Sequence, residues 1–455
     1  MKTNTGNTIV AQATPPGRGG VGIIRVSGSE ALPIAQEILG KNISARTVNF
    51  CNFFAQDKKI IDHGIAIYFS APQSFTGEDV LELHGHGSQV VMDILLQRVL
   101  ELGARLAKPG EFTERAFLNH KLDLVQIEAI ADLINATTQK AAQNAARSLQ
   151  GEFSRRINRL VALLIELRAR IEATIDFVEE EDIEKITSAP FNKEVEDILC
   201  KIGELKNGAK QGMILRDGIT VVITGDTNAG KSSLLNCLSG QDVAIVTDIP
   251  GTTRDVLRVW IQIDGLPVNL LDTAGLHDKP DLIEAEGIRR AWEEVKKADH
   301  VLLVVDASTN SDRSPRELGV DFLKVIPEHN HFTVLYNKID LTREGVKITK
   351  NDGIDCIYLS VKEKQGLSLL KKHLKDSAGV CAIEDGFSAR RRHLDSLERA
   401  EKFLQNIKCD LLKSNEAELI AEELRRAQNA LGEITGEVTT DDLLDKIFAE
   451  FCVGK

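Results

Sequence analysis

The sequence has little of several kinds of residue or pattern, and each shortage excludes a class of protein. No apolar run reaches the ~20 residues of a membrane-spanning helix, and the first residues lead into no signal-peptide core. The seven cysteines are scattered and never spaced as CxxC, which argues against disulfides or a zinc site. A net charge of -12 gives no global positive field for RNA or an anionic membrane, although a local basic patch remains compatible with it. We therefore expect a cytoplasmic protein with reduced thiols.

The pattern of apolar residues, Gly and Pro changes several times along the 455 residues, a length sufficient for about three domains. Residues 1–120 alternate short apolar runs with Gly and Pro, which predicts a small α+β domain. Leu and Ile at three- and four-residue steps predict helices over 121–217, and this periodicity resumes over 376–455. Strand-loop-helix alternation over 218–375 predicts an α/β unit. The predicted fold is thus multidomain, α+β and α/β, with the α/β unit inserted into a discontinuous helical bundle.

A phosphate-binding motif opens the α/β unit. GDTNAGKS, residues 225–232, follows an apolar strand, precedes a helix-forming stretch and matches G-x-x-x-x-G-K-[ST]. Its backbone N–H groups can surround the phosphates, Lys231 can reach the β/γ oxygens, and the Ser232 hydroxyl can coordinate Mg²⁺. In NKID, the Asp340 carboxylate can accept from guanine N1–H and the exocyclic amine, and Asn337 adds a polar contact. These motifs predict a Ras-like P-loop G domain that binds GTP rather than ATP.

Three more segments complete the predicted nucleotide site. Asp272 in DTAG is the expected Mg²⁺-supporting carboxylate, and the Gly275 N–H is the expected γ-phosphate sensor. TDIPGTTRD, 247–255, is placed like a first switch, with Thr253 as a Mg²⁺ ligand, although an ordinary polar loop is the alternative. LSVK, which ends at residue 362, is placed like the last base-contacting loop. The predicted GTP-contacting residues are Asn228, Ala229, Gly230, Lys231, Ser232, Ser233, Thr247, Asp248, Ile249, Pro250, Gly251, Thr252, Thr253, Asp272, Thr273, Ala274, Gly275, Asn337, Lys338, Ile339, Asp340, Ser360, Val361 and Lys362.

The residue after DTAG departs from the Ras pattern. Leu276 stands where a Ras-like GTPase carries the glutamine that orients the attacking water, and its side chain has no hydrogen-bonding atom. Another group must therefore orient the water. The acids that follow are Asp278, Asp281, Glu284 and Glu286. From the residues alone the choice among them stays open, because each is more often a solvent-facing helix acid.

Seven segments resemble, in order and over nearly the whole chain, the MnmE (TrmE) family of tRNA-modification GTPases, of the TrmE-Era-EngA-like group. They are ATPPGRGGVGIIRVSG, SFTGEDVLELHGHG, KPGEFTERAFLNHKLDL, NAGKSSLLN, TDIPGTTRD, DTAGL and TTDDLLDKIFAEFCVGK. A P-loop alone indicates only a nucleotide-binding superfamily, whereas this ordered set is specific. The resemblance implies a homodimer that acts with the FAD-containing protein MnmG in a heterotetramer or larger complex. Together they would add aminomethyl or carboxymethylaminomethyl groups at C5 of wobble uridine 34 of certain tRNAs, with a folate as one-carbon donor.

The resemblance also implies how GTP is hydrolysed. It gives Glu284 the catalytic role of orienting the water. It implies activation by K⁺ in place of an arginine finger, with the ion held by Asn228, Thr247, Ile249 and Thr252. Taken alone, an asparagine in a P-loop is more often a good turn former. G domains of two subunits would pair across this region when GTP and K⁺ are bound.

A second site is implied for the N-terminal, dimerising domain. The resemblance places 5-formyl-tetrahydrofolate, as an analogue of the methylene-carrying donor, on Arg25, Glu82, Lys121 and Lys455. A carboxylate can accept from the pterin's N–H groups and cations can pair with its glutamate tail, although each residue taken singly is more often a surface charge. Cys452 would lie near the folate and the modification chemistry, with a buried structural thiol as an equal alternative.

Two other stretches carry weaker signals. His84 and His86 share a face if they lie in a strand, but no third ligand is evident, so we expect no metal site there. ARRRH, 389–393, is the densest basic stretch and fits either tRNA phosphates or a solvated helix face. Two other functions remain open, namely a regulatory RNA-binding GTPase switch in ribosome assembly and a folate-binding scaffold without turnover.

Overall fold

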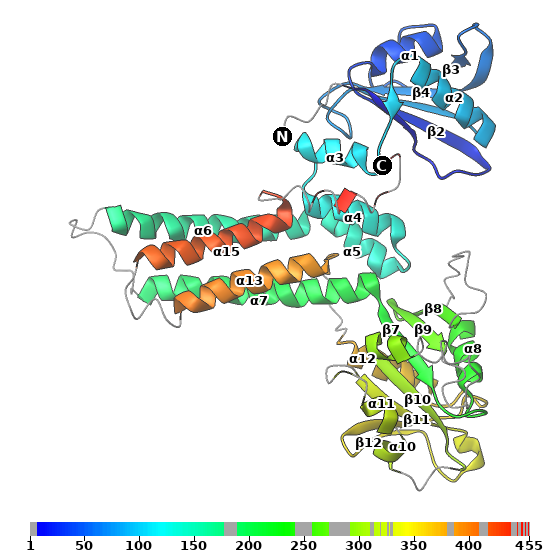
Figure 1. Ribbon diagram of the computed structural model, residues 1–455, viewed down its shortest axis with the longest axis vertical. Helices are drawn as coiled ribbons and strands as arrows, with labels where there is room; N and C mark the ends of the chain where they lie inside the picture. Colours follow the sequence, from blue (N-terminus) through cyan, green and yellow to red (C-terminus); the bar gives the residue numbers. More distant parts are fainter. Residues whose placement is uncertain are drawn as a thin grey trace. The chain divides into compact units, whose positions relative to one another are not determined.

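The computed structural model describes most of the chain, in two compact units (Figure 1). The first unit comprises Met1–Ala131, Phe153–Ala173 and Ala421–Lys455, and the second comprises Asp132–Glu152 and Thr174–Ile420. The described residues are 7–176, 189–241, 257–272, 292–309, 314–318, 320–324, 327, 331–379, 386–408, 417–437, 444, 447, 448, 451 and 454. Among them, no helix is both long enough and apolar enough to cross a bilayer.

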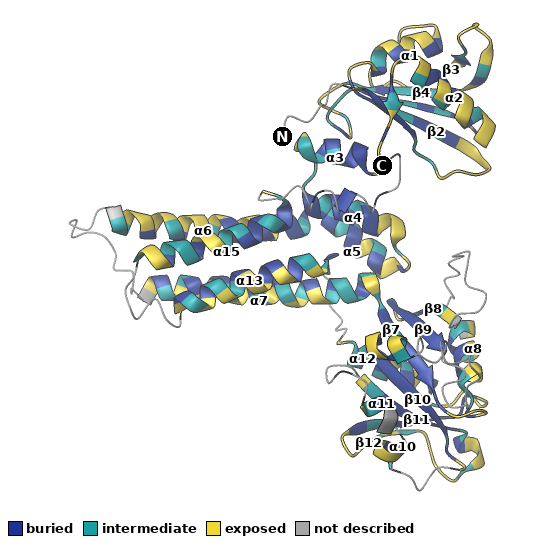
Figure 2. Ribbon diagram, in the orientation of Figure 1, coloured by how far each residue is buried: buried dark blue, intermediate teal, exposed yellow. Residues whose placement is uncertain are grey.

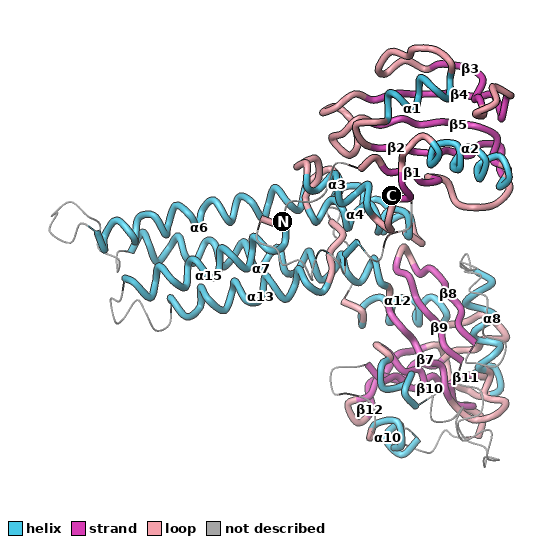
Figure 3. The backbone as a smooth tube through the Cα atoms, turned by 45° about the horizontal axis from the view of Figure 1, so that its top comes forward, coloured by secondary structure: helices cyan, strands magenta, loops and turns pink. Residues whose placement is uncertain are grey.

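A six-stranded sheet forms the N-terminal domain, in the order β3-β4-β5-β2-β1-β6. All strand pairs are antiparallel except β1 with β6. The strands are β1 (Ile9–Gln12), β2 (Gly19–Ser27), β3 (Asn49–Phe54), β4 (Ile60–Phe69), β5 (Val80–Gly87) and β6 (Arg105–Leu106). Helices α1 (Ala31–Leu39) and α2 (Gln89–Glu101) cover one face of the sheet (Figure 3). Along β5, Leu81 and Leu83 point into that core, so Glu82 and His84 lie on the opposite face.

Helices occupy the chain before and after the second sheet. They are α3 (Glu111–Leu118), α4 (Leu124–Asn135), α5 (Gln139–Leu149), α6 (Glu152–Asp176), α7 (Ala189–Asp217), α13 (Arg391–Asn406) and α15 (Ala417–Thr435). Within the second unit, α7 packs along α13, and Lys206 pairs with Glu401 at 2.6 Å. Within the first unit, α4 packs against Ile447, Phe448 and Phe451 near the end of the chain.

The second sheet has seven strands in the order β12-β13-β11-β10-β7-β9-β8, and its interior pairs are parallel. The strands are β7 (Ile219–Thr224), β8 (Leu257–Ile263), β9 (Leu266–Asp272), β10 (His300–Asp306), β11 (His331–Asn337), β12 (Lys347–Asn351) and β13 (Ile354–Tyr358). Its central strands are buried on both faces (Figure 2), as a parallel sheet with two covered faces requires. Around it lie α8 (Lys231–Gln241), α10 (Pro315–Leu318), α11 (Val320–Leu323), η1 (Ile339–Leu341) and α12 (Leu367–Ser377). The predicted fold class is confirmed.

Candidate functional site

The loop between β7 and α8 has the backbone of a phosphate-binding loop. Gly225 and Gly230 adopt left-handed φ values of 137° and 102°. A Cβ on Gly225 would stand 2.1 Å from the Val304 carbonyl oxygen, and one on Gly230 would stand 2.3 Å from Asn337 Nδ2. Only glycine fits at these two positions, and because glycine takes such φ values without strain, the loop can turn tightly before α8. Lys231 Nζ lies over this loop and donates to the carbonyls of Gly225 and Asp226 at 2.7 and 2.8 Å.

The NKID segment at the end of β11 is joined to the phosphate loop by its asparagine. Asn337 Nδ2 donates to the Ala229 carbonyl at 2.8 Å, and Asn337 Oδ1 accepts from Val361 N–H at 3.0 Å. The Asn337 amide is therefore used to hold three loops together, whereas sequence analysis gave it a polar contact with the base. Asp340 Oδ1 accepts from Ser360 Oγ at 2.5 Å, which orients the carboxylate expected to read guanine.

These loops enclose a cavity of about 980 Å³. Most of the described residues predicted to contact GTP line it, whereas Ala229, Asp272, Ile339 and Ser360 are buried and are not part of its lining. Asn236 and Lys364 also line the cavity and were missed: Asn236 is the last residue of NAGKSSLLN, five residues past the phosphate-binding Lys231, and Lys364 lies two residues after LSVK. The lining residues predicted from sequence are Asn228, Gly230, Lys231, Ser232, Ser233, Asn337, Lys338, Asp340, Val361 and Lys362.

Asp272, the predicted Mg²⁺-supporting residue, ends β9 next to β7, where it pairs in register with Ile223. Its side chain is buried, and Oδ1 has no hydrogen-bond partner among the described residues. Burial raises the pKa of the Asp272 carboxyl, and the charge of Lys231 opposes part of that rise. A buried carboxylate oxygen with no partner fits a cation site, since such an atom is otherwise costly.

Several predicted site residues lie outside the described residues. They are Thr247, Asp248, Ile249, Pro250, Gly251, Thr252, Thr253, Thr273, Ala274, Gly275, Glu284, Cys452 and Lys455. Of the predicted K⁺ ligands, only Asn228 is described, with a left-handed φ of 64° and a side chain at the cavity.

In the N-terminal domain, Arg25 and Glu82 face each other across paired strands β2 and β5. Arg25 Nε donates to Glu82 Oε1 at 2.9 Å, and His84 Nε2 lies 3.1 Å from Glu82 Oε2. The Arg25 guanidinium also lies over the rings of Phe75 and Phe112, at 5.7 and 5.9 Å from their centroids. The predicted carboxylate and cation thus lie together on the face of the sheet opposite α1 and α2.

A second cavity, of about 770 Å³, shares Phe75 with this pair. Lys121 contributes to its wall with Arg46, a residue that sequence analysis missed. Arg46 has a left-handed φ of 58°, and its Nη2 donates to the Gln73 carbonyl at 2.8 Å. Aromatic walls with two cations suit a flat, anionic ligand. The lining residues are Arg46, Val48, Ile67, Phe69, Gln73, Ser74, Phe75 and Lys121.

Comparison with known proteins identifies the family. The family described as "MnmE helical domain" matches residues 124–452, and that described as "GTP-binding protein TrmE N-terminus" matches 8–121. The tRNA modification GTPase MnmE of Histophilus somni (strain 129Pt) is 53% identical over 455 residues, covering 99% of both chains. The chain belongs to the MnmE family of tRNA modification GTPases. It is therefore a GTPase, as its phosphate and base loops indicate.

Other relatives agree, and similar solved structures overlap parts of this MnmE family chain. MnmE of Pasteurella multocida (strain Pm70) is 52% identical over 450 residues, covering 98% of this chain and 99% of its own. The G domain of the T. maritima FeoB iron transporter is 25% identical, with a TM-score of 0.27, over 35% of this chain and 98% of its own. A variant of Aquifex aeolicus Era bound to GDP and AlF4⁻ is 23% identical, with a TM-score of 0.28, over 41% of this chain and 66% of its own.

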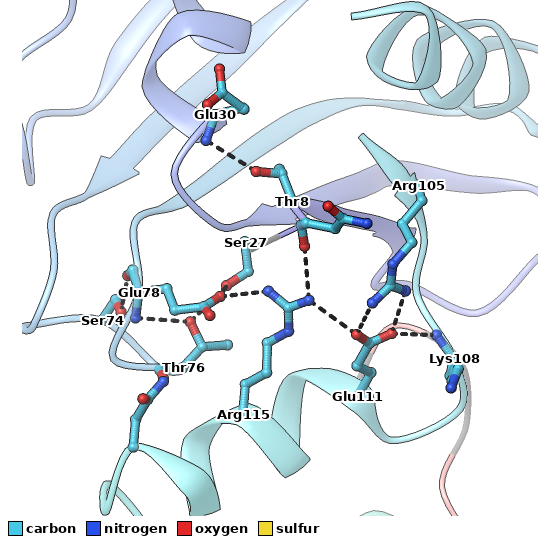
Figure 4. Close-up of polar contacts among 12 residues, drawn as sticks. Thr8, Ser27, Glu30, Ser74, Thr76, Glu78, Arg105, Lys108, Glu111 and Arg115 are labelled. Carbon is cyan, nitrogen blue, oxygen red and sulfur yellow. Dashed lines mark hydrogen bonds and ion pairs between the residues drawn. The ribbon is translucent and has the colours of Figure 1, made fainter. Parts of the chain in front are cut away.

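Two segments that resemble the MnmE family, SFTGED and GEFTER, meet in a buried ion network (Figure 4). Arg115 of α3 pairs with Glu78 at 2.8 Å and with Glu111 at 3.0 Å. Glu78 also accepts from Ser27, and Glu111 from Arg105. Burial alone would raise the pKa of Glu111, but bonds from Arg105, the Lys108 N–H and Arg115 outweigh it and lower that pKa to about 2. The network holds α3 in place, and so also the short segment that leads from α3 to Lys121.

The basic stretch 389–393 does not form one uniform cationic surface. Arg390 is largely buried and donates to Asp132 Oδ1 at 3.1 Å, whereas Arg391 is exposed and pairs with Asp395. The two histidines of HGH also have acidic partners, His84 with Glu82 and His86 with Asp62.

Proposed function

We propose that this chain is a cytoplasmic, homodimeric, K⁺-activated GTPase that modifies C5 of wobble uridine 34 in certain tRNAs. With the FAD protein MnmG, it would install aminomethyl or carboxymethylaminomethyl groups from a folate one-carbon donor. The observation that carries the proposal is the cavity formed by the phosphate and base loops, in a chain 53% identical over 455 residues to a tRNA modification GTPase.

The chain's own groups would hold GTP and Mg²⁺ at this cavity. The backbone N–H groups of residues 225–232 and the Lys231 ammonium would bind the phosphates, while Asp340 reads the guanine. Ser232 and Thr253 would coordinate Mg²⁺, supported by the buried carboxylate of Asp272. The ion would supply positive charge at the phosphate oxygens where negative charge accumulates during transfer.

Potassium activation rests on an amide oxygen at the phosphate loop. Asn228 would hold K⁺ together with Thr247, Ile249 and Thr252, and Glu284 would orient the water that Leu276 cannot. Glu284→Ala should leave GTP binding nearly intact and lower turnover by about 10²- to 10³-fold, as loss of a positioning group does. Single-turnover hydrolysis and nucleotide titration separate the two effects. Persistent turnover in Glu284→Ala would contradict the role given to Glu284. Equal rates of GTP hydrolysis by the wild type in Na⁺ and in K⁺ would contradict the role given to Asn228.

The folate site would lie in the N-terminal domain. Arg25 lies over the Phe75 ring and pairs with Glu82, and Lys121 lines the same cavity as Phe75, which suits a ligand with a flat ring and an acidic tail. The backbone of Gly454 lies against Gln12 at the end of β1, which supports bringing Cys452 and Lys455 to this domain. Binding of 5-formyl-tetrahydrofolate by calorimetry is the direct measurement.

Nucleoside analysis of bulk tRNA tests the whole proposal. Cells lacking this gene should carry wobble uridines unmodified at C5, and restoring the gene should restore the modification. Intact modification in the deleted strain would overturn the proposal. It would favour instead a GTPase switch in ribosome assembly if the chain binds RNA in a GTP-dependent way, or a folate-binding scaffold if it does not.

A further inference from the structure

Both chain connections of the G domain meet at one buried carboxylate, that of Asp132 in α4. The incoming connection is the end of α7, where Arg216 Nε lies 3.0 Å from Asp132 Oδ1. The outgoing connection is the segment 386–390 before α13, where Arg390 Nη2 donates to the same oxygen at 3.1 Å. Ser388 Oγ donates to the other oxygen, Oδ2, at 2.5 Å. We call Asp132, Arg216, Ser388 and Arg390 the clasp.

The outgoing segment is buried although it belongs to no helix or strand. Phe387, Ser388 and Ala389 are 1%, 4% and 1% exposed. Buried irregular backbone needs hydrogen-bond partners, and α5 provides them. The Ser388 N–H donates to Ser148 Oγ at 2.9 Å, and the Ser148 hydroxyl donates to the Ser388 carbonyl at 3.2 Å. Helix α5 thus satisfies both main-chain groups of Ser388, in the middle of the buried segment.

The incoming helix is shaped to receive this segment. Gly208, Gly212 and Arg216 recur every four residues along α7 and so share one helical face. A Cβ on Gly212 would stand 1.9 Å from the Phe387 carbonyl oxygen, and one on Gly208 would stand 3.1 Å from the Phe387 ring. Glycine weakens a helix interior relative to alanine. Gly212 lets the incoming and outgoing backbones touch directly, and Gly208 leaves room for the Phe387 ring.

We propose that Asp132 is a positioning residue that couples the GTPase cycle to tRNA modification. Two separate connections could each bend and would absorb a movement of the G domain. The clasp ties them into one body at their point of entry, so a nucleotide-driven movement is passed on to the helical domain. Asp132 touches neither nucleotide nor folate and acts through the two connections. This inference rests on the function proposed above.

The test compares two activities of the full-length chain, assayed with its partner and tRNA. Asp132→Asn keeps the shape of the side chain and removes its charge. We expect GTP affinity and GTP hydrolysis within about twofold of the wild type, and wobble-uridine modification at least tenfold slower. Glu401→Gln is the matched control, because it removes a charge from another ion pair between α7 and α13, away from the clasp. It should leave both activities near the wild-type values.

Ser388→Ala is a milder variant that removes one hydrogen bond and keeps the arginine pairs, in case Asp132→Asn lowers the folded fraction. Its modification rate should fall about threefold while hydrolysis stays unchanged. A parallel loss of both activities, or unimpaired modification in both variants, would overturn the coupling role. A wild-type chain that hydrolyses GTP but fails to modify tRNA would reject the proposed function, and the coupling with it. If the wild type modifies tRNA and Asp132→Asn does so at the same rate, only the coupling role is rejected.

Discussion

The nucleotide cavity takes its lining from three short motifs, at 225–233, 337–341 and 361–364, together with α8. The N-terminal pocket instead takes single residues from several places, including Arg46, Ile67 of β4 and Lys121. In the first, glycines with left-handed φ aim main-chain N–H groups and fix the geometry locally. In the second, the geometry depends on side chains and on the ion network that fixes α3.

The difference affects how each site can fail. A locally built site is lost when a ligand-contacting group changes, whereas the folding of its domain is little affected. A site assembled from distant side chains is lost when a buried pair that supports it is broken. The two tryptophans make the comparison measurable, because Trp260 and Trp292 both lie in the G domain. Tryptophan fluorescence therefore follows that domain alone, and circular dichroism follows the whole chain.

The largest expected effect is on base recognition. Asp340→Asn puts an amide donor in front of the guanine N–H groups, so we expect GTP affinity to fall by about 10⁴-fold and xanthosine triphosphate to bind better. Tryptophan-detected unfolding should change little. Asp352→Asn is the control, because it makes the same change in the β12–β13 turn, away from the cavity. Unchanged GTP affinity by calorimetry would show that Asp340 does not read the base.

The next effect is on the N-terminal domain. Arg115→Met leaves the carboxylates of Glu78 and Glu111 buried without their shared cation, which should destabilise that domain by about 3 kcal/mol. Circular dichroism should show an earlier thermal transition, while tryptophan fluorescence and GTP hydrolysis stay unchanged. Lys59→Met breaks only the exposed pair with Asp57 and should leave the thermal transition nearly unchanged. Equal losses in the two variants would refute a special role for the network.

As the pH falls, the G domain should lose stability before the N-terminal domain does. Burial, with His373 and His331 nearby, lowers the pKa of His300 in the G domain from 6.5 to about 3. Below pH 6.5 the unfolded chain binds the proton more readily, so the G domain loses stability as pH falls towards 3, by about 2 kcal/mol at pH 5. Glu111 has a folded pKa of about 2 against 4.5, so its contribution is present above pH 4.5 and lost between 4.5 and 2.

Urea unfolding at pH 7.5 and pH 5 separates these contributions. When the pH is lowered from 7.5 to 5, the tryptophan-detected urea midpoint should fall more than the midpoint of the remaining dichroism transition. His300→Gln cannot take up the proton in the unfolded chain, so its midpoint should depend less on pH. A tryptophan-detected midpoint that is equal at the two pH values would falsify this account.

The smallest expected effect is on the N-terminal pocket. Lys121→Met and Arg46→Met each remove one cation from the wall and should weaken 5-formyl-tetrahydrofolate binding by about tenfold, or 1.4 kcal/mol. Lys59→Met, outside this cavity, is again the control. If Arg46→Met binds as the wild type does, Arg46 has no part in the site. GTP hydrolysis in the absence of tRNA should be the same in all three.

The sequence by itself determined the phosphate and base loops, the order of sheet and helical segments, and the identity of the family. Glycine conformations, strand periodicity and contiguous motifs act over a few residues, so a local pattern is enough to predict them. The family resemblance put Arg25 and Glu82 at one site, but only the tertiary structure showed their direct pairing across 57 residues. Only the structure put Arg46 in one cavity wall with Lys121 and assembled the network around Arg115. It also brought Arg390 to Asp132 across 258 residues. Such pairs depend on which surfaces pack together, and neither partner carries a local signal of the other.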